Sequence, residues 1–480
     1  MEITKKKIGL VLGPLLFVLI KLLFHPKGLT DEAVAVLAST VWIAVWWITE
    51  AVDIPVTSLL PIVLFPLSGG MSLTETTASY GHQFIFMFLG GFIIAIAIEK
   101  WSLHKRIALT IIKMVGTNVN QIILGFMIAT AFLSMWISNT ATAVMILPVG
   151  IAVVKHLKDN PSTIENENVL FGKMLMLAIA YSSSIGGMAT LIGTPPNLVL
   201  VGVIQKTYNI EISFLQWFIF GFPLSIVLLY ICWLYLTKFA FKIKQKEFPG
   251  GKEEIENQLQ KLGPITYQEK MVFLVFVLTA LAWILRSFVL VKLFPKIDDT
   301  IIAILFSLIL FVIPSKKDKE AIMTWKDAVT LPWGILLLFG GGMALALGFE
   351  TTGLAAWIGD QLTLLEGASI ILLLVVLIAV INFLTEITSN TAITAMLLPV
   401  LVSLSLIIDI HPYILLVSAT LAASCAFMLP VATPPNAVVF GAGYLKVEDM
   451  VRKGIWMNII SIVIIALFGY YVLPFLWDLN

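Results

Sequence analysis

Long apolar runs separated by short polar stretches dominate the chain. An α-helix needs about 20 consecutive, mostly apolar residues to cross a bilayer, and many of the runs approach that length. The clearest of them cover residues 8–24, 34–48, 84–98, 218–236 and 455–476. The pattern predicts an all-α polytopic membrane protein with about 11 transmembrane helices.

Breaks at glycine, proline and charged clusters divide these runs into two halves. A first transmembrane helix is expected within residues 1–32, and because no small-residue cleavage site follows its apolar run, we interpret it as uncleaved. Five membrane helices are expected in residues 33–241 and five more in residues 269–480. The cytoplasmic linker between them, residues 242–268, is the most polar stretch and contains Pro249-Gly250-Gly251 followed by a pattern typical of a short helix.

The two halves repeat one another. Residues 138–149 return as residues 389–400, with eight of the twelve positions identical and a shift of 251. A pair of glycines upstream follows the same shift, and residues 193–197 return as residues 432–436 after a shift of 239. Matched landmarks in the same order indicate an internal duplication.

Basic residues set the expected orientation. With the N-terminus in the cytoplasm and 11 alternating spans, most of the 30 Lys and Arg residues fall on the cytoplasmic side, as the positive-inside rule requires. The C-terminus is then extracellular. Because each half holds an odd number of spans, the halves are expected to be inverted relative to each other, which is typical of secondary transporters.

A Ser-Asn-Thr sequence lies in each half between two apolar stretches that are short for full crossings. We therefore expect re-entrant hairpins at about residues 120–155 and 369–408, with residues 138–140 and 389–391 at their tips. Ser, Asn and Thr favour helix N-caps, so the positive end of the following helix is expected at each tip. A carboxylate can bind there without an arginine.

A Thr-Pro-Pro sequence interrupts the helical pattern in each half, at residues 194–196 and 433–435. Proline has no N–H donor and its ring clashes with a continuing helix, so both places predict a broken helix with freed carbonyl oxygens. Such backbone is tolerated at membrane depth only where it is buried in protein or lines a polar cavity. Because carbonyl and hydroxyl oxygens suit Na⁺, the tips and breaks together predict a binding site near the midplane.

Each motif also has a simpler structural interpretation. A single Ser-Asn-Thr is more often a helix cap or packing contact, and a single Pro-Pro is more often a kink. Their recurrence in both halves favours a binding site. Glu386, three residues before Ser389, is open to two interpretations, a structural hydrogen bond near the tip or a role in cation coupling. The five histidines fall at predicted helix ends and indicate no metal site.

These motifs resemble those of the divalent anion/sodium symporter family, which includes sodium–dicarboxylate, sodium–citrate and sodium–sulfate cotransporters. The resemblance covers essentially the whole chain, and Gly-Thr-Pro-Pro-Asn and Thr-Glu-Ile-Thr-Ser-Asn-Thr are similar to the bacterial dicarboxylate branch. It implies Na⁺-coupled transport of succinate, malate and fumarate across the cytoplasmic membrane. It also implies a homodimer with a fixed scaffold and a transport domain, made of both hairpins and the helices after them, that moves as an elevator.

The resemblance further implies ligands, position by position. The dicarboxylate substrate would contact Asn139, Thr140, Thr194, Ser389, Asn390, Thr391, Thr433 and Pro434. One sodium ion would contact Ser134, Ser138, Asn139 and Gly193, and a second would contact Thr385, Thr388, Asn390 and Ala432. Thr388 stands where relatives often have alanine and would contribute mainly its backbone carbonyl.

Composition and the motifs that the sequence lacks disfavour the other classes of function. Only 12% of the residues are charged, against about 25% in soluble proteins, and the net charge of +1 indicates no nucleic-acid partner. An enzyme is disfavoured because no zinc or serine hydrolase motif is present, and an anion channel because neither hairpin core contains Lys or Arg. Cys232 and Cys425 lie in separate apolar stretches and predict no disulfide. Sodium-independent exchange of dicarboxylates, 2-oxoglutarate or citrate stays open.

The expected orientation makes a direct labelling prediction. A cysteine introduced at Glu254, in the linker, should resist an impermeant thiol reagent in intact cells, whereas one at Glu366 should react, because the two positions lie on opposite sides of the membrane. Mass-tag labelling of each variant, before and after the cells are opened, measures this. The reverse pattern would overturn the orientation.

Overall fold

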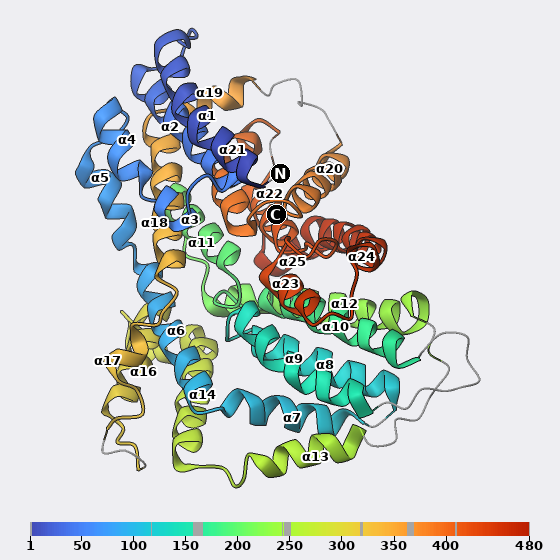
Figure 1. Ribbon diagram of the computed structural model, residues 1–480. Helices are drawn as coiled ribbons and strands as arrows, with labels where there is room; N and C mark the ends of the chain where they lie inside the picture. The colour runs from blue at the N-terminus through green and yellow to red at the C-terminus, as the bar shows by residue number, and fades with distance from the viewer. Residues whose placement is uncertain are drawn as a thin grey trace.

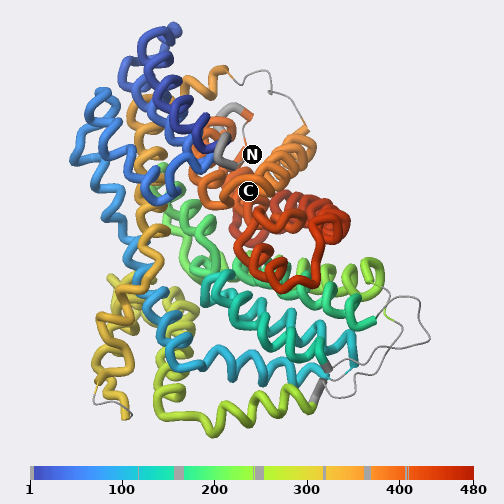
Figure 2. Tube along the Cα trace, in the orientation of Figure 1, coloured from blue at the N-terminus to red at the C-terminus, as the bar shows by residue number. Residues whose placement is uncertain are grey.

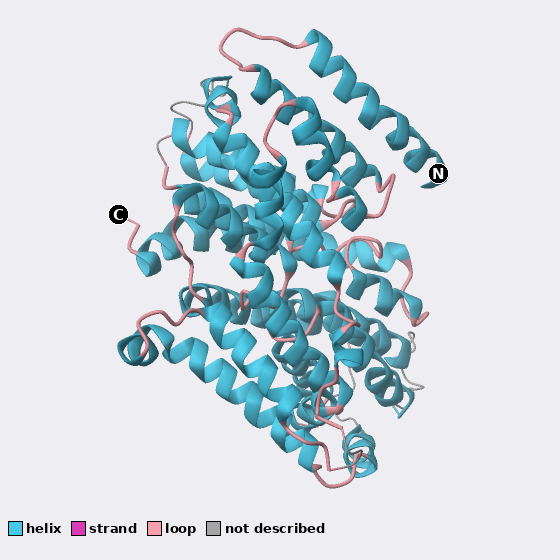
Figure 3. Cartoon of the chain, turned by 90° about the vertical axis from the view of Figure 1, so that its left-hand side faces the viewer, coloured by secondary structure: helices cyan, strands magenta, loops and turns pink. Residues whose placement is uncertain are grey.

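The computed structural model of the protein describes residues 2–116, 118–156, 167–241, 243, 251–316, 320–361, 369–408 and 410–479. Over these ranges the regular elements are helices, and strand-like pairing is limited to isolated bridges such as that between Pro314 and Ala321. Figure 3 shows helices throughout the chain and no strand in the part that is described. The all-α prediction is confirmed.

The first half combines long helices with shorter pieces (Figure 1). In chain order they are α1 (Glu2–Leu23), α2 (Asp31–Thr49), α3 (Ile54–Thr57), α4 (Leu60–Ser68), α5 (Leu73–Ala78), η1 (Ser79–Gly81), α6 (Gln83–Lys100), α7 (Leu103–Val115), α8 (Val119–Ser134), α9 (Asn139–His156), α10 (Glu167–Gly187), α11 (Pro195–Tyr208), α12 (Phe214–Leu234) and η2 (Tyr235–Ala240).

The second half follows after α13 (Gly251–Lys261), the short helix expected behind Pro249-Gly250-Gly251. Its elements are α14 (Tyr267–Leu285), η3 (Arg286–Leu290), α15 (Val291–Leu293), α16 (Asp299–Val312), α17 (Trp325–Ala328), α18 (Trp333–Thr351), α19 (Leu354–Gln361), α20 (Ile370–Leu384), α21 (Asn390–Ile407), α22 (Pro412–Ala423), α23 (Pro434–Gly441), α24 (Val447–Leu467), η5 (Phe468–Val472) and α25 (Leu473–Trp477).

Seven helical stretches in the described ranges are long and apolar enough to cross a membrane. They are Asp31–Thr49, Leu73–Lys100, Glu167–Gly187, Phe214–Ala240, Tyr267–Leu293, Trp333–Thr351 and Val447–Trp477. The apolar arms of the two expected hairpins, α8 with α9 and α20 with α21, fall in a shorter class of 10–17 residues. Their lengths are those that led us to expect hairpins and not full crossings.

The helices begin where the sequence supplies a cap. Side chains of Thr30, Ser72, Asn118 and Thr266 each accept a hydrogen bond from the first turn of the helix that follows, which satisfies donors that the helix itself leaves free. The two Thr-Pro-Pro sequences also mark helix starts, because α11 and α23 begin with their first proline. At that position the missing N–H of proline costs nothing.

Two long helical paths are interrupted before these prolines. The chain leaves α10 at Gly187 and resumes a helix only at Pro195, and it leaves α22 at Ala423 and resumes only at Pro434. We call residues 188–194 the first break and residues 424–433 the second break. The broken helices predicted from Thr-Pro-Pro are present, and the non-helical backbone lies on the N-terminal side of the prolines.

Helices of the two halves pack across each other (Figure 2). α9 packs against α23 of the other half, and α21 packs against α11. The two breaks also meet, because Cys425 Sγ lies 3.7 Å from Met188 Sδ. Nearby, the rings of Tyr181 and Phe427 are edge-on with centroids 5.0 Å apart. Each helix that follows Ser-Asn-Thr therefore lies beside the helix that follows Thr-Pro-Pro in the opposite half.

One arginine attaches the amphipathic helix α7 to the end of the linker. Arg106 Nε donates to Glu269 Oε1 at 2.8 Å, and its Nη1 donates to the Gly263 carbonyl at 3.1 Å. Glu254 lies on α13 in this region. Glu366, the other labelling position, lies outside the described residues, as do most of residues 242–250.

Candidate functional site

At the first tip, a buried serine is hydrogen-bonded to the asparagine of Ser-Asn-Thr. Ser134, at the end of α8, donates from Oγ to Asn139 Oδ1 at 2.6 Å. Ser183 of α10 donates to the Asn139 carbonyl at 2.7 Å, and its Oγ lies 3.3 Å from that of Ser134. Oxygens from three helices therefore meet around Asn139.

The same tip presents the N-terminus of α9. Ser138 Oγ accepts a hydrogen bond from the Ala141 N–H at 3.2 Å, which is the cap expected from the sequence. Ser138 is exposed, while Asn139 and Thr140 are half-buried, so the positive end of the helix is accessible to an anion. Gly187 of α10 packs closely here, because a Cβ added to it would lie 2.5 Å from Asn139 Oδ1.

The second tip has the same construction. Thr385, at the end of α20, is fully buried and donates from Oγ1 to Asn390 Oδ1 at 2.5 Å, with the Ala423 carbonyl oxygen 3.0 Å away. Ser389 Oγ accepts from the Ala392 N–H at 3.4 Å. Both the hydroxyl–amide bond and the serine cap recur after the shift of 251 residues that relates the two sequences.

Thr388 lies at the second tip with its hydroxyl already engaged. Its Oγ1 donates to the Leu384 carbonyl at 2.7 Å, one turn earlier. A hydroxyl that donates to a carbonyl keeps its oxygen lone pairs, so both the hydroxyl oxygen and the backbone carbonyl of Thr388 are candidates for contact with a cation.

The first break lies against the first tip. Gly193 is buried, and a Cβ added to it would collide with the Gly187 carbonyl oxygen, the same Gly187 that packs on Asn139. Thr194 is 5% exposed and makes no side-chain cap to α11. Gly187 therefore contacts both Asn139 and Gly193, two of the residues expected at the first sodium site.

The second break brings its candidates to the start of α23. Ala432 and Thr433 are buried, at 6% and 4% exposure, whereas Pro434 is exposed. Thr433 Oγ1 accepts from the Asn436 N–H at 3.3 Å and so caps the helix. Within the described ranges no hydrogen bond joins the side chains of the two tips, and α9 and α21 are linked instead through their packing on α23 and α11 and the contact between the breaks.

Glu386 is buried, and every one of its hydrogen-bond partners is a donor. Its Oε1 accepts from the Phe427 N–H at 2.8 Å and from Asn458 Nδ2 at 2.7 Å. Its Oε2 accepts from the Leu429 N–H at 2.9 Å, and the Met428 N–H lies within 3.2 Å of both oxygens. The carboxyl group thereby satisfies three backbone donors of the second break, which favours the structural interpretation of this residue.

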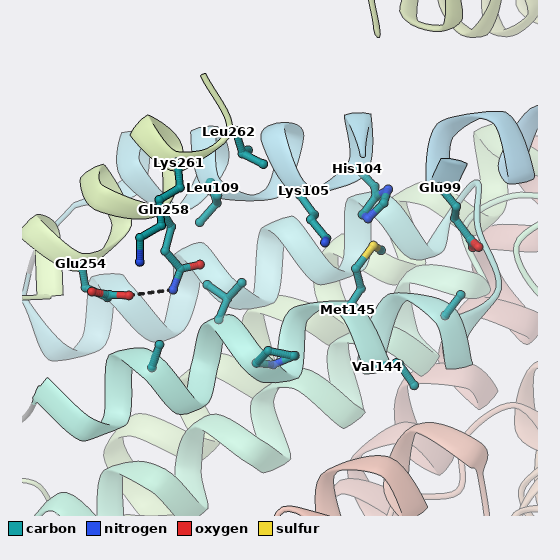
Figure 4. A pocket seen from close by; sticks show the side chains of 14 residues that line it. Glu99, His104, Lys105, Leu109, Val144, Met145, Glu254, Gln258, Lys261 and Leu262 are labelled. Atoms are coloured by element: carbon teal, nitrogen blue, oxygen red, sulfur yellow. Dashed lines mark hydrogen bonds between the residues drawn. The ribbon is translucent and has the colours of Figure 1, made fainter. Parts of the chain in front are cut away.

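A cavity of about 780 Å³ runs along α9 from Ala141, next to the first tip, to Ala152. Its other walls come from the end of α6, from α7 and from α13 (Figure 4). In Figure 4 the side chains of His104 and Lys105 extend toward Met145 of α9. The cavity therefore connects the first tip with the layer formed by the amphipathic helix and the linker helix.

The groups able to hold a cation are the hydroxyl, amide and carbonyl oxygens at the tips and breaks. In the described part of the chain, no group of three or more His, Cys, Asp or Glu residues lies close enough together to hold a metal ion. Oxygens without sulfur or imidazole suit hard cations such as Na⁺, Ca²⁺ or Mg²⁺.

Two polar residues of the first half escaped the sequence reasoning. Ser183 contacts Asn139, and Thr190 Oγ1 donates to the Met135 carbonyl at 2.5 Å, so both attach the first break region to the first tip. A signal was present in the three consecutive serines, residues 182–184, within an apolar span. Such serines usually mediate helix packing, and only the fold distinguishes the one that reaches the tip.

Residues 4–477 match the family model described as the sodium:sulfate symporter transmembrane region. The chain belongs to this family. Among curated members, it is 49% identical over 477 residues to the sodium-dependent dicarboxylate transporter SdcS of Staphylococcus saprophyticus, with 97% of this chain and 91% of that protein covered. It is 50% identical over 473 residues to SdcS of Staphylococcus aureus strain RF122, with the same coverage.

Solved structures share the fold at much lower identity. MtrF of Neisseria gonorrhoeae aligns with a TM-score of 0.58 and 12% identity, covering 95% of this chain and 97% of that one. The YdaH transporter of Alcanivorax borkumensis aligns with a TM-score of 0.58 and 11% identity, covering 83% and 87%. At these identities the likeness concerns the fold alone.

Membership of the sodium:sulfate symporter family confirms the resemblance found from the motifs. The protein is a multi-pass membrane transporter, and the relatives named above are transporters. The limits of the two repeats, their inverted orientation and the roles of individual site residues stay predictions.

Replacing Glu386 separates its two interpretations. In Glu386→Ala, the N–H groups of Met428 and Leu429 lose their acceptor and that of Phe427 keeps only Asn458 Oδ1 at 3.2 Å. Each unsatisfied group costs about 1–3 kcal/mol, so the thermal midpoint of the purified protein should fall strongly. Tryptophan fluorescence during heating in detergent measures this.

Glu448→Ala is the matched control, because the Glu448 side chain is 68% exposed and surface substitutions usually change stability by no more than about 0.5 kcal/mol. A Glu386→Ala protein that unfolds at the wild-type temperature but loses sodium dependence would favour the cation-coupling interpretation instead.

Proposed function

We propose that this protein is a secondary active transporter that carries C4-dicarboxylates such as succinate, malate and fumarate across the cell membrane, with Na⁺ as the coupling ion. The observation that carries the proposal is the pair of equivalent tips, each with a buried hydroxyl bonded to an asparagine at a helix N-terminus. The 49–50% identical relatives are named sodium-dependent dicarboxylate transporters, which supports the substrate class and the ion.

In the proposed substrate site, each carboxylate of the dianion lies at one tip. The first turns of α9 and α21 offer free N–H groups and a positive helix end, and the neighbouring side chains add hydroxyl and amide donors. The contacting residues are Asn139, Thr140, Ser389, Asn390 and Thr391, with Thr194, Thr433 and Pro434 beside them. The cross-packing of α9 on α23 and of α21 on α11 supports one shared site built from both halves.

The proposed sodium sites use the oxygens beside each tip. One takes Ser134, Ser138, Asn139 and Gly193, and the other takes Thr385, Thr388, Asn390 and Ala432. Their hydroxyl, amide and carbonyl oxygens fit a hard monovalent cation, and in each half a hydroxyl oxygen already lies within 2.6 Å of the asparagine oxygen.

Charge balance explains why sodium would be needed. A dianion that enters a low-dielectric site loses hydration worth several kcal/mol per charge, and helix N-termini offset only part of that loss. None of the proposed substrate residues is Lys or Arg. Two sodium ions next to the tips would neutralise the dianion, so we expect ion and substrate to bind together.

For the movement, we propose an elevator in which both hairpins and the helices after them form the transport domain within a homodimer. The two cross-packed helix pairs and the joined breaks support one rigid unit containing both tips. In the proposed orientation the N-terminus is cytoplasmic and the C-terminus extracellular. The cavity beside α9 then connects the first tip with the cytoplasmic side, where a substrate would leave.

Removing either asparagine amide should stop transport without unfolding the protein. Asn139→Ala and Asn390→Ala each remove a group that is proposed to serve both substrate and cation, so uptake of labelled succinate into proteoliposomes should fall at least tenfold, or about 1.4 kcal/mol. Asn120→Ala, at an exposed position on α8, is the control and should transport normally. Normal uptake by both tip variants would exclude the proposed site.

Sodium should raise the affinity for succinate, and the coupling should be reciprocal. Because Ser138 and Thr385 are proposed to contact sodium, Ser138→Ala and Thr385→Ala should raise the sodium concentration for half-maximal uptake before they alter the choice among succinate, malate, fumarate and citrate. Uptake measured across sodium concentrations at constant ionic strength tests this. Equal succinate binding in sodium and in choline would contradict symport and favour sodium-independent exchange.

A further inference from the structure

Two asparagines that the proposed function does not use occupy the same place in both halves. Asn197 is the third residue of α11 and Asn436 is the third residue of α23, and they are related by the shift of 239 residues. Both side chains are fully buried, at 0% exposure. A buried amide is costly unless it is hydrogen-bonded, so its contacts indicate what it does.

In the first half, the side-chain amide of Asn197 donates hydrogen bonds to backbone carbonyls of the first break. Its Nδ2 donates to the Thr190 carbonyl at 2.8 Å and lies 3.5 Å from the carbonyl oxygens of both Gly187 and Met188. Thr190 is also the residue whose hydroxyl reaches the first tip. One amide group therefore gathers several carbonyl oxygens of a short non-helical segment.

In the second half, Asn436 makes the equivalent contacts. Its Nδ2 donates to the Leu429 carbonyl at 3.0 Å and to the Ala426 carbonyl at 3.3 Å. Leu429 and Ala426 are the residues that the shift of 239 pairs with Thr190 and Gly187. The hydrogen bonds from the asparagine amide to the break are thus repeated in the second half, although most of the residues of the two breaks differ in type.

The backbone carbonyl that accepts from the asparagine amide also accepts a hydrogen bond from the proposed sodium ligand of the same half. The Thr190 carbonyl accepts from the Gly193 N–H at 3.4 Å, and the Leu429 carbonyl accepts from the Ala432 N–H at 3.2 Å. The amide, the shared carbonyl and the ligand peptide therefore form a short chain of hydrogen bonds. The N–H and the carbonyl of Gly193, and likewise of Ala432, are joined through one Cα, so displacing the amide would move the residue whose carbonyl is proposed to face the cation.

The orientation of both amides follows from these contacts. A side chain turned by 180° would place its oxygen against carbonyl oxygens, so the NH₂ group must face the break. In both halves the Oδ1 atom then has no hydrogen-bond partner among the described residues. The chain tolerates this unpaired acceptor at the same place twice, which indicates that the NH₂ contacts are what the position requires.

We propose that Asn197 and Asn436 are positioning residues for the two sodium sites, each holding the ligand peptide of its own half, Gly193 or Ala432, in place for the cation. The inference rests on the proposed sodium coupling. Neither side chain needs to touch the ion, since each acts through the carbonyl that it shares with the ligand peptide.

Substitution by aspartate tests the inference, because ionised Asp has nearly the shape of Asn but no donor. Its negative charge would by itself lower the sodium requirement, so a raised requirement reports the lost donor. Asn197→Asp and Asn436→Asp should each raise the sodium concentration for half-maximal succinate uptake roughly tenfold, as expected when one or two hydrogen bonds that hold a ligand are lost. The maximal rate at saturating sodium should stay within about twofold of wild type. Because the two effects act at separate sites, the double variant should show their product.

Trp217→Phe is the matched control. Trp217 Nε1 donates to the Met188 carbonyl of the same break at 3.0 Å, but it does not touch the carbonyl shared with Gly193, so its loss should leave the sodium requirement unchanged. Unfolding temperatures without sodium, and their rise on adding sodium, are measured for every variant. The Asp variants should lose part of that rise.

Three results would overturn the inference. The first is an unchanged sodium requirement in both Asp variants. The second is an equal shift in Trp217→Phe, which would mean that any disturbance of the break has the same effect. The third is failure of the Asp variants and of Asn197→Ala to fold, which would make the amide a requirement for folding only. A wild-type protein without sodium dependence would instead refute the proposed function.

Discussion

Backbone hydrogen bonding at membrane depth is the constraint on which this structure depends. An unpaired N–H or C=O group in hydrocarbon costs several kcal/mol, yet the chain interrupts its helices at two tips and two breaks. Serine caps satisfy donors at the tips, and Asn197, Glu386 and Asn436 each bond the backbone of the break in their own half. Helices of the opposite half pack beside both breaks, so each interruption is stabilised by side chains of its own half and by packing of the other.

The two halves satisfy this constraint with different side chains. Small residues and hydroxyls join the first break to the first tip, through Gly187, Ser183 and Thr190. The second half places the Glu386 carboxyl group at the corresponding point, where it accepts three backbone N–H groups and the amide of Asn458. The two halves therefore share the hydrogen bonds made by their asparagines. They differ in the side chains that join each break to its tip.

The sequence predicted the features that depend on local residue order. The short apolar arms around each Ser-Asn-Thr correspond to α8 with α9 and to α20 with α21, and Pro249-Gly250-Gly251 predicted the helix that begins at residue 251. It could not predict contacts between residues far apart in the chain, such as Ser183 with Asn139. Nor could it predict the partners of Glu386, because three of them are backbone N–H groups that every residue other than proline carries. The sequence showed Asn197 only as the last residue of a repeated motif. The carbonyl groups that its amide contacts are known only from the fold.

The central claim is that two capped helix ends, each with a sodium ion beside it, hold one dicarboxylate between the halves. A structure of the protein in lipid nanodiscs with sodium and succinate tests it most directly, with a second structure in choline as reference. The claim predicts succinate density that joins the first turns of α9 and α21, with ion density next to Asn139 and Asn390, both lost in choline. Succinate bound elsewhere, for example against Lys105 and Lys261 in the cavity beside α9, would contradict it.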